Sequence, residues 1–343
     1  MKLINNSLND RTMNTFKKSL AILLSLIICL PLPSAVKVHT IGDSTMATYA
    51  SGSPKTGWGQ VLQQFFTKDV KVTNHALSGR SSKSFYQEKW SSVKSQINEG
   101  DYVIIQFAHN DEKANGLDGD TLNAYYKSVG KSESADARGT SPNGTYKDYL
   151  RKYINETREK GGKPILVSSI CRKYFSGNSI KRNGRHDLGD KFDKLTANGL
   201  TSGNKVPTSD HTYDYPYQMK LVAEEMGVPY IDMTAATAEL FIKTGESSVT
   251  TWFASGDNTH TNATGAEIMA ELGARLLKEA GIMADSIVLP GEAPNALPII
   301  NTENMNACDD EAQYFDLQGR PIVPDANFQG ILIDQKGKKI LVK

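Results

Sequence analysis

The stretch Ile41-Gly42-Asp43-Ser44-Thr45 follows an apolar run at residues 36–41 that is typical of a buried strand. A serine at the point where a strand ends and a glycine-bearing turn begins lies at the rim of a sheet. Open α/β folds place their binding and catalytic groups at that rim. The stretch therefore predicts an α/β fold with Ser44 at its functional edge.

Strand-like and helix-like segments alternate along the rest of the chain. Apolar runs typical of further strands occupy residues 70–74, 102–107, 164–169 and 228–232. Apolar residues at helical spacing occupy residues 57–66, 90–98, 146–154, 215–226 and 264–280. This alternation favours a parallel sheet joined by right-handed crossovers and covered on both faces. The predicted fold class is α/β, a three-layer α/β/α sandwich.

Two long segments interrupt the pattern. Residues 112–144 are polar and rich in Gly, Ser, Asp and Asn, and residues 172–214 carry many basic side chains. Connections of this length without secondary structure of their own are usually functional or mobile. We expect both segments to be irregular.

The two ends of the chain differ in composition from its middle. Residues 1–35 resemble an export signal, because Lys17-Lys18 precede an apolar run at 20–30 and small residues follow it. A membrane anchor is the alternative, but the run is short for a bilayer. We expect a secreted or periplasmic protein, possibly at the cell surface, with no membrane span after signal cleavage.

The remaining sequence divides into three parts. We predict one main α/β domain at residues 36–285, a proline-punctuated linker at 286–313, and a small β-rich C-terminal appendage at 314–343 with strand-like runs at 330–333 and 339–342. Cys171 and Cys308 remain once the signal is removed, and a disulfide or two separate thiols are both open.

The charge balance excludes some classes of partner. The 343 residues include 39 Lys and Arg against 38 Asp and Glu. No net charge directs the chain to nucleic acid or to an anionic membrane surface. Recognition of an acidic ligand would depend on local placement of basic side chains.

Asp257 and His260 form a pattern suited to activating a serine. A serine hydroxyl is a weak nucleophile until a base accepts its proton, and a third group must orient the base. A carboxylate three residues before an imidazole can hold one ring nitrogen while the other faces Ser44. Asp-x-x-His is common, however, and Asp257 or Thr261 could instead cap the helix expected near residue 264.

Gly79 and Asn110 are candidates for stabilising a developing negative oxygen. Gly79 can present its backbone N–H unobstructed, and Asn110 offers an amide directly after the strand predicted at 102–107. Each also has a simple interpretation as a turn former. Because Ser44, Gly79 and Asn110 all follow predicted strands, we expect them at the same edge of the sheet.

These motifs, together, resemble the four blocks of the SGNH or GDSL hydrolase superfamily. The narrower similarity is to rhamnogalacturonan acetylesterases, and it runs from about residue 36 to residue 280. The segments that carry the narrower similarity are Gly42-Asp43-Ser44-Thr45-Met46, Gly57-Trp58-Gly59, Ala76-Leu77-Ser78-Gly79-Arg80-Ser81, Gly100-Asp101-Tyr102-Val103 and Asp257-Asn258-Thr259-His260. The superfamily block that contains Asn110 is His109-Asn110-Asp111.

The resemblance implies a flavodoxin-like sheet and a serine esterase that removes acetyl groups from galacturonate-containing plant cell-wall polysaccharide or oligosaccharide. It implies Ser44 as nucleophile, His260 as base and then acid, and Asp257 as the group that orients His260. The oxyanion donors would be the N–H of Ser44, the N–H of Gly79 and the Asn110 amide. It implies no metal and no organic cofactor.

Other polar residues were weighed against simpler roles. Arg80 and Arg172 follow strand ends and could pair with galacturonate carboxylates, for which guanidinium offers a two-pronged donor, or could form a solvated rim. We interpret Asp43 as a turn residue and His109 as a structural hydrogen-bonding residue. His186-Asp187 and His211 lack a tight ligand spacing and are interpreted as solvated surface rather than as a metal site.

Two other functions remain open from the sequence. One is an esterase or lipase on another acyl substrate such as acetylxylan, although no extended apolar stretch near the motifs would form an acyl groove. The other is a noncatalytic glycan-binding module, which an intact set of Ser44, Asp257 and His260 disfavours.

Overall fold

The computed structural model describes residues 36–291 and, beyond them, the backbone of five short strands between residues 299 and 342. A five-stranded parallel sheet forms the centre, in the order β2-β1-β3-β4-β9. Its strands are β1 (Lys37–Gly42), β2 (Lys71–Asn74), β3 (Tyr102–Gln106), β4 (Lys163–Val167) and β9 (Tyr230–Ile231). This order is that of flavodoxin-like sheets, and the direction of winding reverses between β1 and β3.

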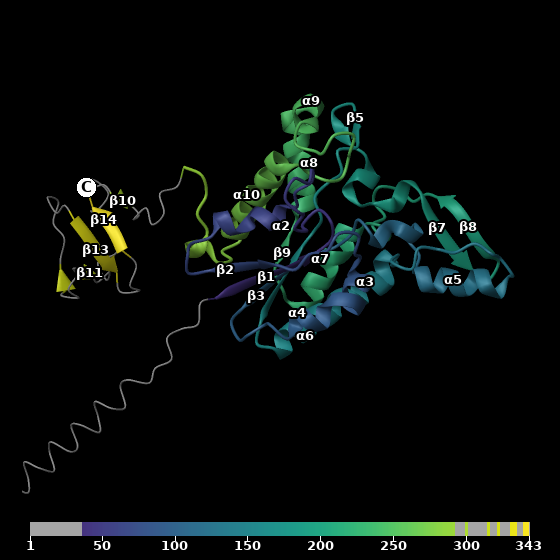
Figure 1. The fold of residues 1–343 in the computed structure, drawn as a ribbon, viewed down its shortest axis with the longest axis horizontal. Coiled ribbons are helices and arrows are strands. Elements are labelled where there is room, and N and C mark those ends of the chain that lie inside the picture. The colour runs from purple at the N-terminus through teal and green to yellow at the C-terminus, as the bar shows by residue number, and fades with distance from the viewer. Residues whose placement is uncertain are drawn as a thin grey trace, which may run out of the picture.

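Each strand contributes to two separate cores, because successive side chains point to opposite faces. In β3, Val103 and Ile105 join one hydrophobic cluster and Ile104 joins the other. Helices α2 (Trp58–Val61), α8 (Met233–Thr244) and α10 (Ala263–Glu279) cover one face, and α3 (Ser82–Phe85), α4 (Ser91–Lys94), α6 (Lys147–Glu159) and α7 (Tyr215–Met226) cover the other (Figure 1). The predicted three-layer α/β/α sandwich is confirmed.

The two segments expected to be irregular contain regular structure. Residues 112–144 include α5 (Gly119–Ser128), which Asp118 caps by accepting from the Thr121 N–H at 3.0 Å. Residues 172–214 include two hairpins, β5 (Phe175–Ser176) with β6 (Ser179–Ile180) and β7 (Phe192–Thr196) with β8 (Gly199–Asn204).

The expectation of irregular loops was therefore wrong. These elements expose most of their surface, so they lack the apolar periodicity that reveals a core helix or strand. Helix α5 and the β7–β8 hairpin project together from one end of the sandwich (Figure 1).

Helix boundaries also differ from those predicted. The helix expected at 90–98 begins at Ser82, where Ser81 and Ser84 form a reciprocal capping box, and α4 ends at Lys94. Helices α8 and α9 (Glu246–Thr250) were not predicted. A run of Ala and Thr in α8 gives little contrast between its two faces.

The C-terminal strands form a second sheet, in the order β10-β14-β13-β11-β12. The strand-like runs at 330–333 and 339–342 coincide with β13 (Gly330–Asp334) and β14 (Lys339–Val342), which pair antiparallel. The other strands are β10 (Ile299–Ile300), β11 (Tyr314–Phe315) and β12 (Pro321–Ile322).

Several expectations fall on residues outside those described: the signal at 1–35, most of the linker at 286–313, and Cys308. Cys171 is buried and unpaired, its Sγ lies 3.1 Å from Thr234 O, and burial raises the pKa of its thiol to about 12. Over the described residues, every helix is too short or too polar to cross a membrane.

Candidate active site

Ser44 lies in the turn that follows β1, at the carboxyl edge of the sheet. Asp43 shapes this turn, because its Oδ1 accepts from the Thr45 N–H at 2.9 Å and from the Thr45 hydroxyl at 2.7 Å. Gly42 is required by close packing: a Cβ there would lie 2.8 Å from the carbonyl oxygen of Gln106 on β3. The turn holds Ser44 6% exposed at the point where the winding of the sheet reverses.

Ser44, His260 and Asp257 form a continuous hydrogen-bonded chain. The Ser44 Oγ lies 2.9 Å from His260 Nε2, and His260 Nδ1 lies 2.7 Å from Asp257 Oδ2. The other carboxylate oxygen accepts from the backbone N–H groups of Thr259 at 2.8 Å and His260 at 2.9 Å. With Nδ1–H donated to Asp257, Nε2 is free to accept the serine proton.

The electrostatics of Asp257 keep it ionised. Burial alone would raise its pKa, but the backbone N–H groups of His260 and Thr259 and the side chains of His260 and Lys55 outweigh burial, so its pKa falls well below the usual range. The helix-cap alternative for Asp257 and Thr261 does not hold, because α10 is capped by Asn262, which accepts from the Gly265 N–H at 3.1 Å.

Lys55 is a member of this cluster that the sequence did not indicate. Its Nζ lies 3.1 Å from Asp257 Oδ2 and 3.3 Å from His260 Nδ1. It comes from the loop before α2 and reaches Asp257 across about 200 residues of sequence, so no local pattern could have identified it.

Gly79 and Asn110 lie at the same sheet edge as Ser44. Gly79 has a φ of +78°, a left-handed conformation that glycine adopts without strain. Within residues 36–291, the N–H groups of Ser44 and Gly79 donate to no protein acceptor. The Asn110 Nδ2 donates to Arg80 O at 3.1 Å, which leaves its second N–H for another acceptor.

Arg138 joins these two donors and was also missed. Its Nη1 donates to Gly79 O at 3.0 Å and lies 3.5 Å from Asn110 Oδ1. Asp136 holds the guanidinium through bonds of 2.9 and 2.6 Å. Both residues belong to the segment that was expected to be an irregular loop.

A cavity of about 700 Å³ opens over Ser44 and His260. Arg172 lines it and is neutralised by Glu112, at 2.8 Å. Four exposed lysines also line it, and none of them forms an ion pair with a described residue. They are Lys113, Lys181, Lys191 and Lys205.

The two arginines proposed for substrate binding therefore lie differently. Arg172 faces the cavity, whereas Arg80 does not line it and binds Glu88 through bonds of 3.0 and 2.7 Å. Substrate binding by either residue stays a prediction.

His109 lines this cavity and His186 packs edge-on against it, and both differ from expectation. His109 is 4% exposed, and neither of its ring nitrogens has a hydrogen-bond partner in the described chain, so its interpretation as a structural hydrogen-bonding residue was wrong. Burial, then the nearby charges of His186 and Arg172, hold its pKa well below the usual value.

His186 is fully buried rather than solvated. Its Nδ1 lies 2.7 Å from Glu112 Oε1 and its Nε2 lies 2.8 Å from Ile170 O. Burial alone would raise the Glu112 pKa, but Arg172 and His186 outweigh it and lower the pKa. The surface interpretation of this histidine failed because its neighbours come from distant segments. In the described residues, no group of three or more His, Cys, Asp or Glu side chains could hold a metal ion.

The comparisons with known proteins agree with this geometry. Rhamnogalacturonan acetylesterase RhgT of Bacillus subtilis (strain 168) is 31% identical over 264 residues, which cover 72% of this chain and 91% of the relative. The rhamnogalacturonan acetylesterase of Emericella nidulans is 27% identical over 78% of this chain and 95% of its own length. The solved structure of YxiM from Bacillus subtilis shares the fold, with a TM-score of 0.53 and 22% identity over 72% of this chain and 57% of that one.

The family itself follows from the sequence match. Residues 40–268, which include Ser44, Gly79, Asn110, Asp257 and His260, match the model of the GDSL-like Lipase/Acylhydrolase family. This chain belongs to that family.

Proposed function

We propose that this carboxylic ester hydrolase removes O-acetyl groups from an acidic pectic polysaccharide, rhamnogalacturonan, through an acetyl-serine intermediate. The observation that supports serine-dependent ester hydrolysis is the hydrogen-bonded chain from Ser44 through His260 to Asp257. The relatives named as rhamnogalacturonan acetylesterases support the substrate.

The reaction would proceed in two half-reactions. The Ser44 hydroxyl passes its proton to His260 Nε2 while Oγ attacks the acetyl carbonyl carbon. The oxygen that becomes negative is stabilised by the N–H groups of Ser44 and Gly79 and by the Asn110 amide. His260 then protonates the departing sugar oxygen, and the acetyl group remains on Ser44. In the second half, His260 takes a proton from water and the resulting hydroxide attacks the acetyl-serine. His260 then returns this proton to the Ser44 Oγ as the acyl–oxygen bond breaks and acetate leaves.

The charge of the cavity supports an acidic polymer over a neutral one. The four lysines, which are unpaired in the described chain, line the cavity above Ser44 and outnumber its carboxylates, Asp190 and the paired Glu112. A charged wall of this kind attracts uronate carboxylates and offers nothing comparable to neutral xylan. This observation is what favours a pectic substrate over acetylxylan.

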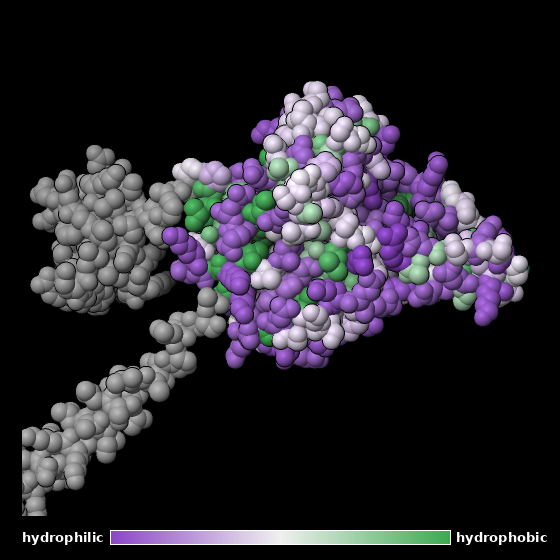
Figure 2. All heavy atoms as spheres, viewed as in Figure 1, coloured by the Kyte–Doolittle hydropathy of each residue, from purple (hydrophilic) through white to green (hydrophobic). Residues whose placement is uncertain are grey.

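A long-chain lipid substrate receives no support. The exposed large hydrophobic residues in the described chain are Val36, Val129, Tyr217 and Ile242, and none of them lines the cavity above Ser44. Figure 2 shows a face on which hydrophilic residues predominate and hydrophobic ones occur in small groups. Because an acyl groove needs contiguous apolar surface, a lipase-like role is disfavoured.

The place of action is part of the same proposal. A polysaccharide of the plant cell wall is met outside the cytoplasm, and residues 1–35 resemble an export signal. We infer a secreted or periplasmic location, possibly at the cell surface.

The test is acetate release from acetylated rhamnogalacturonan and acetylated xylan in parallel, for the protein and its Ser44→Ala variant. Release from the pectic polymer that Ser44→Ala abolishes supports the proposal. Ser44-dependent release from xylan alone would contradict the proposed pectic substrate and leave the proposed serine mechanism intact. No Ser44-dependent release from either polymer or from 4-nitrophenyl acetate overturns the esterase and leaves a noncatalytic glycan-binding module.

Replacement of the lysines tests the charge argument separately. Lys191→Ala should raise KM for the pectic polymer about threefold and leave hydrolysis of 4-nitrophenyl acetate unchanged. Lys243→Ala, on α8 outside the cavity, is the control. An equal effect of the two variants would remove the charge argument.

A further inference from the structure

A second cavity, of about 370 Å³, lies behind one wall of the catalytic cavity. The shared wall is the segment 181–191, which contains the short 3-10 helices Arg182–Arg185 and Leu188–Asp190. Lys181, Leu188 and Asp190 line the catalytic side. Arg182, Arg185 and Asp187 line the other. One segment of about ten residues therefore shapes both cavities.

The second cavity also lies at the carboxyl edge of the central sheet. Asp232 and Thr234 follow β9 and line it, just as Ser44 follows β1. Ligands in open α/β folds bind beyond the carboxyl ends of the strands. The position is therefore one where the fold can hold a ligand.

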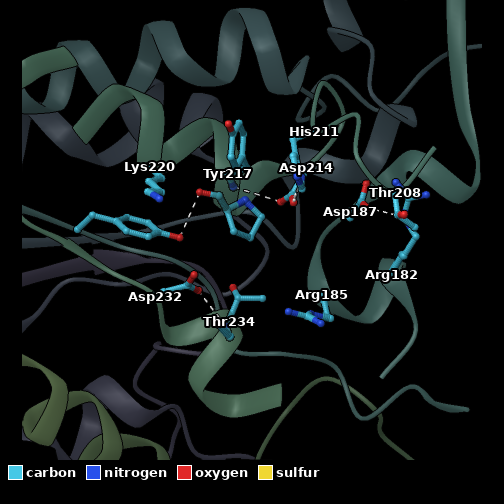
Figure 3. A pocket seen from close by; sticks show the side chains of 13 residues that line it. Arg182, Arg185, Asp187, Thr208, His211, Asp214, Tyr217, Lys220, Asp232 and Thr234 are labelled. Atoms are coloured by element: carbon cyan, nitrogen blue, oxygen red, sulfur yellow. Dashed lines mark hydrogen bonds and ion pairs between the residues drawn. The ribbon is translucent and has the colours of Figure 1, made fainter. Parts of the chain in front are cut away.

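Tyr217 provides an aromatic surface at this cavity. It is 37% exposed, and its ring is stacked on that of His211 with centroids 4.3 Å apart and planes at 21°. Figure 3 shows the two rings side by side, opposite Arg185 and Asp232. A ring supported on one face and open to solvent is rigid, and the apolar C–H face of a sugar can pack on it.

The ion pairs around the cavity leave two cations available. Arg182 is held by Asp187, and His211 lies 3.2 Å from Asp214. In the described chain, the Arg185 side chain has no hydrogen-bond or ion-pair partner, and Figure 3 shows it directed toward Thr234 and Asp232. Lys220 has only a long contact, 3.7 Å, with Glu224. Guanidinium binds a carboxylate through two parallel bonds.

A hydroxyl-bearing ligand would also find an acceptor here. Asp232 Oδ1 is occupied by the Ala235 N–H at 2.8 Å and the Ser168 hydroxyl at 3.1 Å, so the carboxylate is fixed in place. An aromatic platform, a fixed carboxylate and unpaired cations together suit a sugar that carries both hydroxyls and an acid group.

We propose that this cavity is a noncatalytic binding site for a uronate-containing oligosaccharide segment. The sugar would stack on Tyr217, its carboxylate would pair with Arg185, and its hydroxyls would donate to Asp232. Because the cavity shares its wall with the catalytic one, a bound polymer stays next to Ser44 between acetyl removals. The identity of the polymer rests on the proposed function, but binding at this site requires no ester hydrolysis.

The test is affinity electrophoresis of the full chain carrying Ser44→Ala in gels that contain polygalacturonate, which has no acetyl group to remove. Adding Arg185→Ala or Tyr217→Ala should weaken retardation about threefold or more. Arg275→Ala, an exposed arginine on α10 outside both cavities, should not. Gels with neutral xylan should give no retardation that depends on Arg185.

Two outcomes overturn the inference. One is equal retardation of the Arg185→Ala, Tyr217→Ala and Arg275→Ala variants. The other is loss of retardation only when Lys191 in the catalytic cavity is replaced. Folding of each variant is checked by its thermal midpoint, with Arg185→Lys as a conservative variant that should recover part of the binding. If the protein with Ser44 intact releases no acetate but binding of the Ser44→Ala chain still depends on Arg185, the proposed function fails and this inference stands.

Discussion

The imidazole of His109 packs edge-on against that of His186, with ring centroids 4.3 Å apart and planes at 86°. His186 is fixed by Glu112 and by Ile170 O, whereas both ring nitrogens of His109 lack a partner in the described chain. Buried polar atoms in native proteins are nearly always hydrogen-bonded. His109 lines the cavity over Ser44, but both of its ring nitrogens are buried from solvent, so a substrate hydroxyl reaches them only if the cavity wall opens.

Replacement of His109 by leucine separates this role from a structural one. His109→Leu breaks no hydrogen bond within the described protein, so the free energy of unfolding should stay the same or rise. The kcat/KM for the acetylated polymer should change by less than about twofold, because the buried nitrogens are out of reach of a substrate hydroxyl. Urea denaturation and steady-state kinetics measure the two effects. A tenfold fall in kcat/KM with unchanged stability would show instead that the wall opens and that His109 binds the substrate.

The hydrogen bonds of Asp257 predict the effect of making it an amide. In Asp257→Asn the oxygen must remain where it accepts the two backbone N–H groups of Thr259 and His260, so the NH₂ faces His260 Nδ1. The imidazole then carries its proton on Nε2 and cannot accept one from Ser44. The kcat should fall by about 10⁴. Ser44→Ala is the reference, and a loss of less than tenfold for Asp257→Asn would contradict this orienting role.

The position of Ser44 and Asn110 at one edge of the sheet could be predicted from the order of the motifs and the predicted strands. The physical reason is the parallel sheet. Ser44 and Asn110 follow β1 and β3, which are adjacent and parallel and so end at one edge. Residues that follow such strands meet without any local pattern linking them. Buried strands such as β3 were predictable because their apolar runs are continuous.

The residues and elements that the sequence did not predict either depend on contacts between distant segments or lie on exposed surface. Lys55 and Arg138 reach the site from loops, and single polar residues in loops have no periodicity. The hairpin β7–β8 is polar on most of its surface, so its strands resemble a loop. His186 was interpreted as solvated, because its burial depends on Glu112 and Ile170, which approach only in the folded chain.

Arg138 is a positioning residue, and its loss should lower turnover without changing affinity. Arg138→Ala removes the donor that holds Gly79 O and leaves Asn110 Oδ1 without its contact. Misplaced oxyanion donors stabilise the transition state less, so kcat should fall about tenfold, equally for the polymer and for 4-nitrophenyl acetate, with KM unchanged. Arg138→Lys should recover part of the activity. A change confined to KM for the polymer would show instead that Arg138 binds the sugar.

His75 predicts how stability depends on pH. Its Nε2 lies 3.0 Å from His39 Nδ1, and burial, followed by the charges of His39 and Lys89, lowers its pKa to about 4 from 6.5. His75 is therefore protonated below about pH 6.5 in the unfolded chain but only below about pH 4 in the folded chain. The contribution of neutral His75 to the free energy of unfolding is complete above pH 6.5 and is lost as the pH falls to 4. In His75→Gln, the amide can still donate to His39 but does not titrate. The drop in unfolding free energy between pH 7 and 4.5 should shrink by on the order of 1–2 kcal/mol, allowing for solvent screening of a partly exposed ring.

Urea midpoints at a series of pH values measure this difference. Parallel pH profiles for the two proteins would mean that His75 does not contribute to acid sensitivity.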